Sequence, residues 1–178
     1  MKEKIRQLDL AALEVIHYPD PRLTAICTPI EDVDDGVRAL IDRMFELMFE
    51  LRGVGLAAPQ VGVTVRLFIA SPDFGPEDRQ VYVNPRIIDT QGVQDGEEGC
   101  LSFPGISCKV KRKKIATIRA LDRDGRKFER TGEDLTARIF QHETDHLDGR
   151  LLVDRMGSVA RLASRRALKD LEAAFADQ

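Results

Sequence analysis

Apolar residues recur every three or four positions between residues 34 and 53, which is the spacing of one face of an α-helix. Asp34 or Asp35 can cap the start of this helix, and Gly53 can end it. Residues 158–176 have a similar amphipathic pattern. The pattern therefore predicts one helix in the N-terminal half of the chain and one at the C-terminus.

Other segments have the composition of strands. VTVRLFIA, which follows Gly62, and QVYVNPRII at residues 80–88 are rich in β-branched residues. Pro85 favours an edge position for the second strand, because proline has no N–H to donate to a neighbouring strand. KIATIRALDRDGRKFER predicts a hairpin that turns at Asp124 and Gly125.

TGEDLTARIFQHETDHLDG, residues 131–149, predicts a further helix. Thr131 and Asp134 can form a capping box at its start, and Gly149 can end it. Helices and strands do not alternate regularly, which favours an α+β fold. We expect small antiparallel or mixed sheets around this central helix, with the N-terminal-half and C-terminal helices outside it.

Length and composition narrow the class of protein. A chain of 178 residues is most simply one domain, residues 1–178. The net charge of -3 gives no general attraction to nucleic acid, and no apolar run is long enough to span a membrane. The N-terminus lacks a signal or transit pattern, and three cysteines fit a reducing compartment. We therefore expect a cytoplasmic protein.

The predicted central helix contains the pattern HExxH, which is typical of zinc hydrolases. Leu135 and Ile139 continue to His142 and His146 at helical steps, so both imidazoles lie on the inward face and can meet on one cation. Glu143 is about 100 degrees round the helix from His142. It can lie beside the metal as a general base without binding it. The alternative is a pair of core histidines satisfied by ordinary hydrogen bonds.

A catalytic zinc-type site needs a third protein ligand. His17 lies in a predicted loop close to Pro19 and Pro21, which favours a structural role. Among the cysteines, Cys27 has the setting of a small buried residue and Cys108 begins a basic strand. Cys100 follows a glycine and precedes a short loop, and its thiolate would be a strong ligand.

Three segments are informative together: GVGLAAPQ at 53–60, EEGCLS at 97–102 and QHETDH at 141–146. In combination they resemble the signature motifs of the peptide deformylase family. The resemblance implies a hydrolase of N-terminal protein processing during protein biosynthesis. Such an enzyme removes the N-formyl group from the N-terminal methionine of newly synthesised proteins and releases formate.

The resemblance also implies the roles of individual residues. The metal ligands would be Cys100, His142 and His146, with a water as fourth ligand and nucleophile. Glu143 would be the general acid and base, while the Gln60 side chain and the Leu101 backbone N–H would stabilise the oxyanion. We expect five further residues at the substrate: Gly55, Val54, Leu135, Ile139 and Arg138.

Within that group, Gly55 would let substrate backbone approach closely, and the apolar side chains would line a methionine pocket. Arg138 either contacts the substrate, pairs with Glu97 or Glu98, or faces solvent. One thiolate and two imidazoles suit iron, zinc, nickel or cobalt. The resemblance implies one Fe(II) ion per chain, with zinc second.

Two basic segments, residues 109–114 and the predicted C-terminal helix, could contact binding partners. KVKRKK, residues 109–114, is either a nucleic-acid patch or, as we favour, a solvated edge strand. We expect no membrane contact and no direct nucleic-acid readout. The resemblance implies that the C-terminal helix docks on the ribosome. Two other functions stay open: a zinc metallopeptidase that cleaves peptide bonds with the same helix, and a metal-stabilised ribosome- or RNA-binding module.

Overall fold

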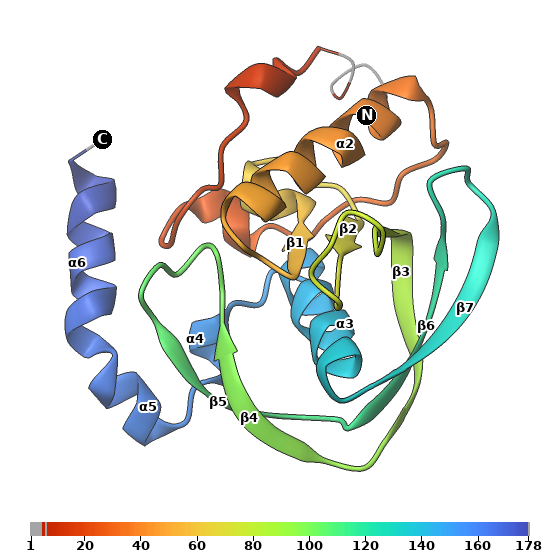
Figure 1. Ribbon diagram of the computed structural model, residues 1–178. Helices are drawn as coiled ribbons and strands as arrows, with labels where there is room; N and C mark the ends of the chain where they lie inside the picture. The colour runs from red at the N-terminus through yellow and green to blue at the C-terminus, as the bar shows by residue number, and fades with distance from the viewer. Residues whose placement is uncertain (1–4, 6, 178) are drawn as a thin grey trace.

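The computed structural model describes residue 5 and residues 7–177 and has the α+β architecture expected from the sequence (Figure 1). Its α-helices are α2 (Asp35–Glu50), α3 (Asp134–Leu147), α4 (Leu152–Arg155), α5 (Ser158–Ala163) and α6 (Arg165–Ala176). Its strands are β1 (Gly55–Ala57), β2 (Leu67–Ala70), β3 (Gln80–Gln91), β4 (Gln94–Gly99), β5 (Ser107–Arg112), β6 (Ile115–Leu121) and β7 (Lys127–Glu133). Short 3-10 helices are η1 (Leu10–Ala12), η2 (Pro21–Thr24) and η3 (Ala58–Val61).

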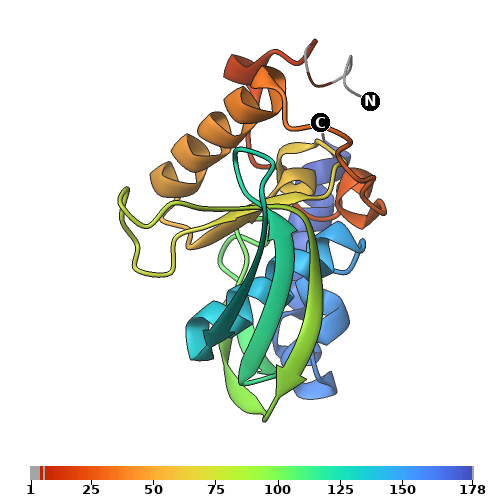
Figure 2. The ribbon, with the colours of Figure 1, turned by 90° about the vertical axis from the view of Figure 1, so that its right-hand side faces the viewer.

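The strands form two antiparallel sheets. A five-stranded sheet has the order β1-β2-β3-β6-β7, and β4 pairs with β5 in a separate two-stranded sheet. Figure 1 shows α3 between the two sheets, while Figure 2 shows β3, β6 and β7 as long neighbouring strands. The predicted α+β fold with small antiparallel sheets is therefore confirmed.

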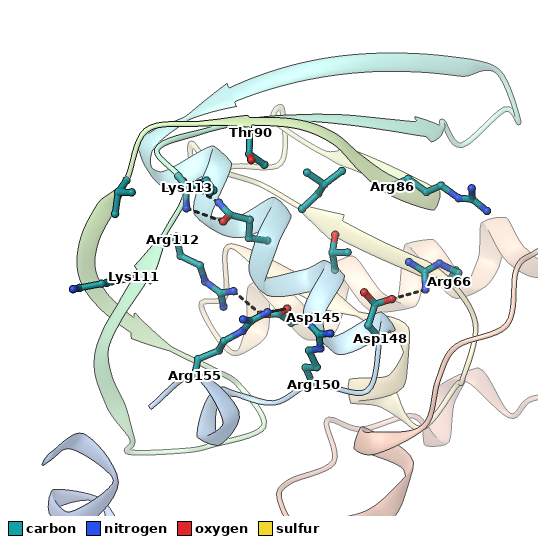
Figure 3. Close-up of a pocket in the computed structure, with 14 residues that line it drawn as sticks. Arg66, Arg86, Thr90, Lys111, Arg112, Lys113, Asp145, Asp148, Arg150 and Arg155 are labelled. Atoms are coloured by element: carbon teal, nitrogen blue, oxygen red, sulfur yellow. Dashed lines mark hydrogen bonds and ion pairs between the residues drawn. The ribbon is translucent and has the colours of Figure 1, made fainter. Parts of the chain in front are cut away.

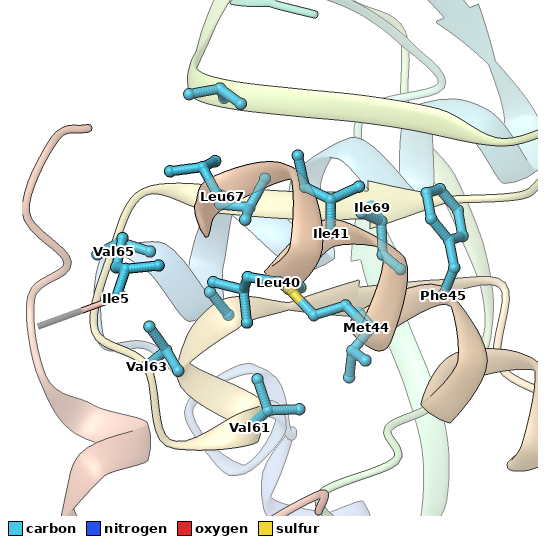
Figure 4. Packing of buried hydrophobic residues seen from close by; sticks show 14 of the residues in the cluster. Ile5, Leu40, Ile41, Met44, Phe45, Val61, Val63, Val65, Leu67 and Ile69 are labelled. Carbon is cyan, nitrogen blue, oxygen red and sulfur yellow. The ribbon is translucent and has the colours of Figure 1, made fainter. Parts of the chain in front are cut away.

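Helix α2 begins where the sequence predicts. The Val37 N–H donates to the Asp34 carboxylate at 3.1 Å, which satisfies one of the unpaired amides of the first turn. The apolar face of the helix packs on β1, β2 and η3 in the first core cluster (Figure 4). Leu40, Ile41 and Met44 are completely buried there. The cluster holds the strand that precedes η3 firmly against the rest of the molecule.

Strand β3 corrects one expectation. We expected an edge strand because of Pro85, but β3 is the middle strand of the five. The pairing of β3 with β6 shifts register between Val83 and Arg86, and Asn84 there has a φ of 52°. This irregularity accommodates a residue without an N–H, so a bulge allows proline in a central strand.

Helix α3 is also shorter at its start than the sequence predicts. Thr131 lies in β7, where its hydroxyl meets the Thr117 hydroxyl at 2.9 Å, so the predicted capping box is wrong. Glu133 occupies the cap position without a side-chain bond, and Asp134 enters the helix with a φ of 48°. The β-branched threonine is taken up by the sheet ladder instead. Gly149 ends the helical region with a φ of 70°.

The C-terminal segment differs from the single helix that we expected, because Ser164 separates α5 from α6. Leu168 is buried, whereas Val159 and Leu162 of α5 are 81% and 71% exposed. The Tyr18 hydroxyl donates to the Glu172 carboxylate at 3.0 Å and ties α6 to the N-terminal segment. Among the described residues, the chain has no helix with the length and apolarity that crossing a membrane requires.

Candidate active site

Three potential metal ligands from two distant segments meet at one point. The Cys100 sulfur lies 3.3 Å from Nε2 of His146, and this nitrogen lies 3.2 Å from Nε2 of His142. Ligand atoms of all three residues lie within 4.8 Å of one another. Around a tetrahedral ion with bonds of 2.0–2.3 Å, neighbouring donors are about 3.3–3.6 Å apart, so the cluster has the size of a metal site.

Secondary structure explains this convergence. His142 and His146 are one turn apart in α3 and face the same side. Cys100 follows β4 directly, and the pairing of β4 with β5 fixes the turn that carries it. We did not predict β4, because its sequence QDGEEG has low strand propensity. Its backbone pairing with β5 outweighs that preference.

A buried carboxylate orients the first histidine. Glu98 accepts hydrogen bonds from Nδ1 of His142 at 2.5 Å, from Arg112 at 2.6 and 3.1 Å, and from Arg138 at 2.9 Å. Burial alone would raise the pKa of Glu98, but the bonds from His142 and Arg112 outweigh it and lower this pKa. Glu98 therefore stays ionised and turns Nε2 of His142 toward the ligand cluster.

Sequence reasoning considered Glu98 only as a partner of Arg138 and missed its contact with His142. Its position two residues before Cys100 was the available signal, because alternate residues of a strand share a face. Of the three alternatives for Arg138, the structure shows the pairing with Glu98. Arg138 is buried and also donates to the Val110 carbonyl at 3.0 Å.

The network of ion pairs continues behind the site through Arg112. From the sequence we expected this residue in a solvated basic strand. Strand β5 is a strand as expected, but Arg112 is buried. It donates to Asp145 at 2.5 Å, and Asp145 also accepts from Arg155. Alternation along β5 sends Arg112 inward while Lys109 and Lys111 stay exposed. The basic run thus contributes one buried arginine, which forms ion pairs with both Glu98 and Asp145.

Gln60 lies in η3 with its amide directed at the cluster. Its Oε1 accepts the Ala57 N–H at 2.9 Å, and its Nε2 donates to the Cys100 sulfur at 3.4 Å and to the Ser102 hydroxyl at 3.2 Å. The Ala57 bond fixes which end of the amide faces the cluster. Gln60 and Ser102 are both buried, so this amide N–H group is held in a desolvated position.

Glu143 is buried beside the ligands, and its Oε2 has no hydrogen-bond partner among the described residues. Burial raises the pKa of Glu143 to about 7. Gly55 makes room for this carboxylate, since a Cβ at that position would overlap Oε1 of Glu143. We expected Gly55 to admit substrate backbone; the structure shows that its missing side chain admits Glu143.

These groups open onto a pocket of ≈ 950 Å³. Its lining includes all five expected substrate residues: Val54, Gly55, Leu135, Arg138 and Ile139. Ile139 is buried, whereas Leu135 is 48% exposed at the helix start. Leu101 also lines the pocket directly after Cys100. The exposed His17, for which we expected only a structural role, contributes to the same lining.

The two imidazoles differ in their electrostatic surroundings. Burial opposes protonation of His142, but bonds with Cys100 and Glu98 outweigh it and raise its pKa well above the ordinary value. Burial and the nearby His142 lower the pKa of His146. The two shifts have opposite directions because His142 bonds directly to the Glu98 carboxylate, whereas His146 lies beside His142 and the Arg112 guanidinium.

The residues fit a metal ion by this donor chemistry and by the unpartnered Glu143 oxygen beside them. A thiolate and two imidazoles would supply three ligands to a divalent ion, and a buried carboxylate beside them can take up a proton. Together with the α+β fold, this arrangement places the chain in the class of metal-dependent hydrolases. The profile of the polypeptide deformylase family matches residues 12–162. The chain therefore belongs to that family.

Individual relatives are similar over almost the whole chain. The peptide deformylase of Alkalilimnicola ehrlichii is 44% identical, covering 91% of this chain and 92% of the relative. That of Pseudomonas aeruginosa is also 44% identical, with 90% and 96% covered. Among solved structures, the Legionella pneumophila enzyme superposes with a TM-score of 0.86 at 42% identity, covering 93% of this chain and 98% of its own. Plant peptide deformylase 1B from Arabidopsis thaliana reaches 0.89 at 40% identity, with 93% of each chain covered.

Proposed function

We propose that this chain hydrolyses the formamide at the N-terminal methionine of newly synthesised proteins, with Cys100, His142 and His146 holding one divalent ion. Family membership establishes the deformylase activity, and the convergence of these three side chains supports their assignment as ligands. When bound, the ion supplies Lewis acidity, lowering the pKa of a water toward ~7 and polarising the formyl oxygen.

Glu143 supplies the proton transfers. Its unpartnered oxygen accepts a proton from the attacking water, and the same carboxyl then donates a proton to the leaving nitrogen. A pKa of about 7 suits both directions at neutral pH, since the group neither holds nor releases the proton too strongly. Gly55 keeps the carboxylate in place because no side chain competes for its space.

Gln60 and the Leu101 N–H stabilise the charge that develops on the former formyl oxygen. The Ala57 bond pre-orients the Gln60 amide toward Cys100 and the pocket, so little reorganisation is needed during reaction. Leu101 is the next residue after Cys100 and lines the same pocket, which supports a position for its N–H beside the proposed ligands. Removing one such donor typically lowers the rate by about 100- to 1000-fold.

The methionine side chain occupies the apolar part of the pocket. Ile139 and Val54 offer buried and half-buried apolar surface, and Leu135 borders the opening. An unbranched thioether adapts well to such a slot. Arg138, bound to Glu98 and Val110, stabilises the wall of the pocket and is not free to grip the peptide.

The native ion in this proposal is Fe(II), with zinc second and nickel or cobalt as substitutes. The ligand set of one sulfur and two nitrogens supports all four metals. Metal analysis of protein purified without oxygen tests the assignment, because a thiolate-bound ferrous site is prone to oxidation. Zinc alone in fully active protein would contradict the iron assignment.

We place the enzyme in the cytoplasm as one domain, with the C-terminal helices α5 and α6 as the ribosome-docking part. Exposed apolar side chains on α5 and basic ones on both helices support docking. Binding to 70S ribosomes is measured with and without residues 158–178. Equal binding of both forms would reject docking through this segment.

One assay tests the activity against the peptidase alternative. The Fe(II)-loaded chain is incubated with formyl-Met-Ala and, separately, with unformylated peptides, and both formate and free amines are followed. We expect formate from the formylated peptide and no cleavage of internal bonds. Cleavage of internal peptide bonds without formate would instead support a metallopeptidase, and no turnover with tight ribosome binding would support a binding module.

A further inference from the structure

A second pocket, of ≈ 770 Å³, lies on a different face of α3 from the active site. Helix α3 contributes Gln141, Thr144 and Asp145 to it, and none of these lines the active-site pocket. The remaining walls come from β3, β5 and the segment that follows α3 (Figure 3). Three of the lining residues, Lys111, Arg112 and Lys113, belong to the basic run KVKRKK.

Positive charge is concentrated around this basic pocket. Among the described residues, seven basic and two acidic ones line it, in a chain whose net charge is -3. The basic residues are Arg66, Arg86, Lys111, Arg112, Lys113, Arg150 and Arg155, and the acidic ones are Asp145 and Asp148. Such a local excess attracts polyanions even when the whole chain is acidic.

Part of this charge is used inside the protein. Arg112 and Arg155 bind Asp145, and Arg66 binds Asp148 at 2.8 Å. These pairs fix the floor of the basic pocket. They do not account for the other cations around its rim.

The remaining cations are exposed. Arg86, Lys111, Lys113 and Arg150 form no ion pair within residues 7–177. Lys111 stands opposite Asp95 in the β4–β5 ladder, so its charge is partly offset. Arg86, Lys113 and Arg150 therefore carry most of the uncompensated charge.

Arg86 lies in an electrostatically unfavourable position within the sheet. Its cross-strand neighbour in β6 is Arg119, and like charges placed opposite each other destabilise a sheet. The Arg119 guanidinium binds Glu129 at 2.7 Å on its other side, whereas Arg86 has no carboxylate partner in the described part of the chain. A ligand that brings negative charge to Arg86 would relieve this repulsion.

We propose that the basic pocket binds the phosphate backbone of folded RNA. Figure 3 shows Lys111 and Arg86 at opposite sides of the opening, with Arg150 below, so one small anion would not reach all of them, whereas successive phosphates would. The lining residues that the structure describes include no aromatic side chain on which an unpaired base could stack. Contacts of this kind position a protein on a duplex without reading its sequence.

The choice of RNA over DNA rests on the proposed function, because newly made proteins are carried by RNA-rich machinery. The test measures binding of the metal-loaded enzyme to a fluorescein-labelled RNA hairpin over a series of salt concentrations. For Arg86→Glu, Lys113→Glu and Arg150→Glu combined, we expect binding to weaken by about tenfold or more. The slope of log affinity against log salt is negative, and its magnitude should decrease by about two or three in the triple variant. This corresponds to about 0.9 for each lost phosphate contact.

A second triple variant is the matched control. Arg79→Glu, Arg126→Glu and Lys127→Glu change the net charge equally at exposed positions outside the pocket and outside the C-terminal helices. We expect RNA affinity within about twofold of the parent, since surface charges away from the contact act only through the screened field. An equal loss in both triple variants would overturn the proposal.

Binding to other phosphate-containing molecules distinguishes RNA from DNA and from lipid headgroups. RNA binding no tighter than binding to a DNA duplex of the same sequence, or binding only to vesicles of anionic lipid, would overturn the assignment to RNA. Formate release from formyl-Met-Ala is followed in the same preparations and should stay unchanged in both triple variants. Loss of RNA binding with intact formate release would therefore show that the pocket binds RNA independently of catalysis. Absence of formate release in the parent protein would instead contradict the proposed function.

Discussion

Glu143 and Thr144 are neighbours in α3, and each has a buried side-chain oxygen without a hydrogen-bond partner among the described residues. Glu143 faces the active-site pocket, whereas Thr144 lines the basic pocket on the other face of the helix. The two residues are adjacent in the same helix, and both have an unpaired buried oxygen. They differ in what the rest of the fold places around them.

The surroundings explain why only one of these oxygens implies catalysis. Three metal-ligand candidates lie beside Glu143, and the missing side chain of Gly55 leaves room for its carboxylate. Burying an ionisable group is costly, and burial raises the pKa of Glu143 to about 7. Thr144 is neutral, and an unpaired hydroxyl costs about 1–3 kcal/mol without any comparable chemistry. An unsatisfied polar atom is thus informative only together with its neighbours.

Of the variants that test the difference between Glu143 and Thr144, Glu143→Ala should have the largest effect. We expect turnover to fall by about 100- to 10,000-fold, because the proton acceptor is lost, while the bound metal is retained. Formate release and metal content are measured on the same samples. Loss of the metal with Glu143→Ala would show that this residue is a ligand and not a base.

Gly55→Ala should reduce turnover by about 100-fold, since a methyl group would displace the Glu143 carboxylate from its position. The control is Gly75→Ala, where an added Cβ meets no heavy atom within 4 Å. We expect the control to keep full activity. If Gly55→Ala were also fully active, the proposed close fit between this glycine and Glu143 would be wrong.

Glu98→Gln should weaken metal affinity by about 10- to 100-fold, because the charged acceptor that orients His142 is lost. Competition with a chelator measures the affinity. Glu97→Gln is the matched control, since Glu97 is exposed and adjacent to Glu98 in β4. Equal affinities in the two variants would argue against an orienting role for Glu98.

The pH dependence of kcat/KM sharpens the assignment of Glu143 as a base. Only the ionised carboxylate can accept a proton, so activity is present above the pKa of Glu143 and falls as the pH drops through it. We expect this fall at or below about pH 7, because a bound cation favours the charged form. Below the midpoint the decrease is about tenfold per pH unit. Activity that increased with acidity would contradict the assignment.

The smallest effect is expected for Thr144→Val, on the other face of the helix. Valine has nearly the same shape and removes the unpaired hydroxyl, so stability should be unchanged or rise by about 1 kcal/mol. Chemical denaturation measures the free energy of unfolding, and formate release should stay at the parent level. A loss of activity comparable to that of Glu143→Ala would remove the distinction between the two faces.

Local patterns predicted much of the fold. The helical spacing before Gly53 and the turn at Asp124 and Gly125 are both present in the structure. The expectations that failed concerned contacts between segments: the edge position of β3, the capping role of Thr131 and the unbroken C-terminal helix. Each depends on a partner strand or packing surface that is distant in sequence, so local propensity could not decide it.

By itself, the sequence determined the helix with His142 and His146 on one face, because helical periodicity is a local property. Its three motifs also indicated the family and the candidate thiolate Cys100. Only the tertiary structure decided that Glu98 orients His142, that Gly55 makes room for Glu143, and that cations from separate segments surround a second pocket. Those relations join residues far apart in the chain, and only the packing of sheets against α3 sets the distances between them.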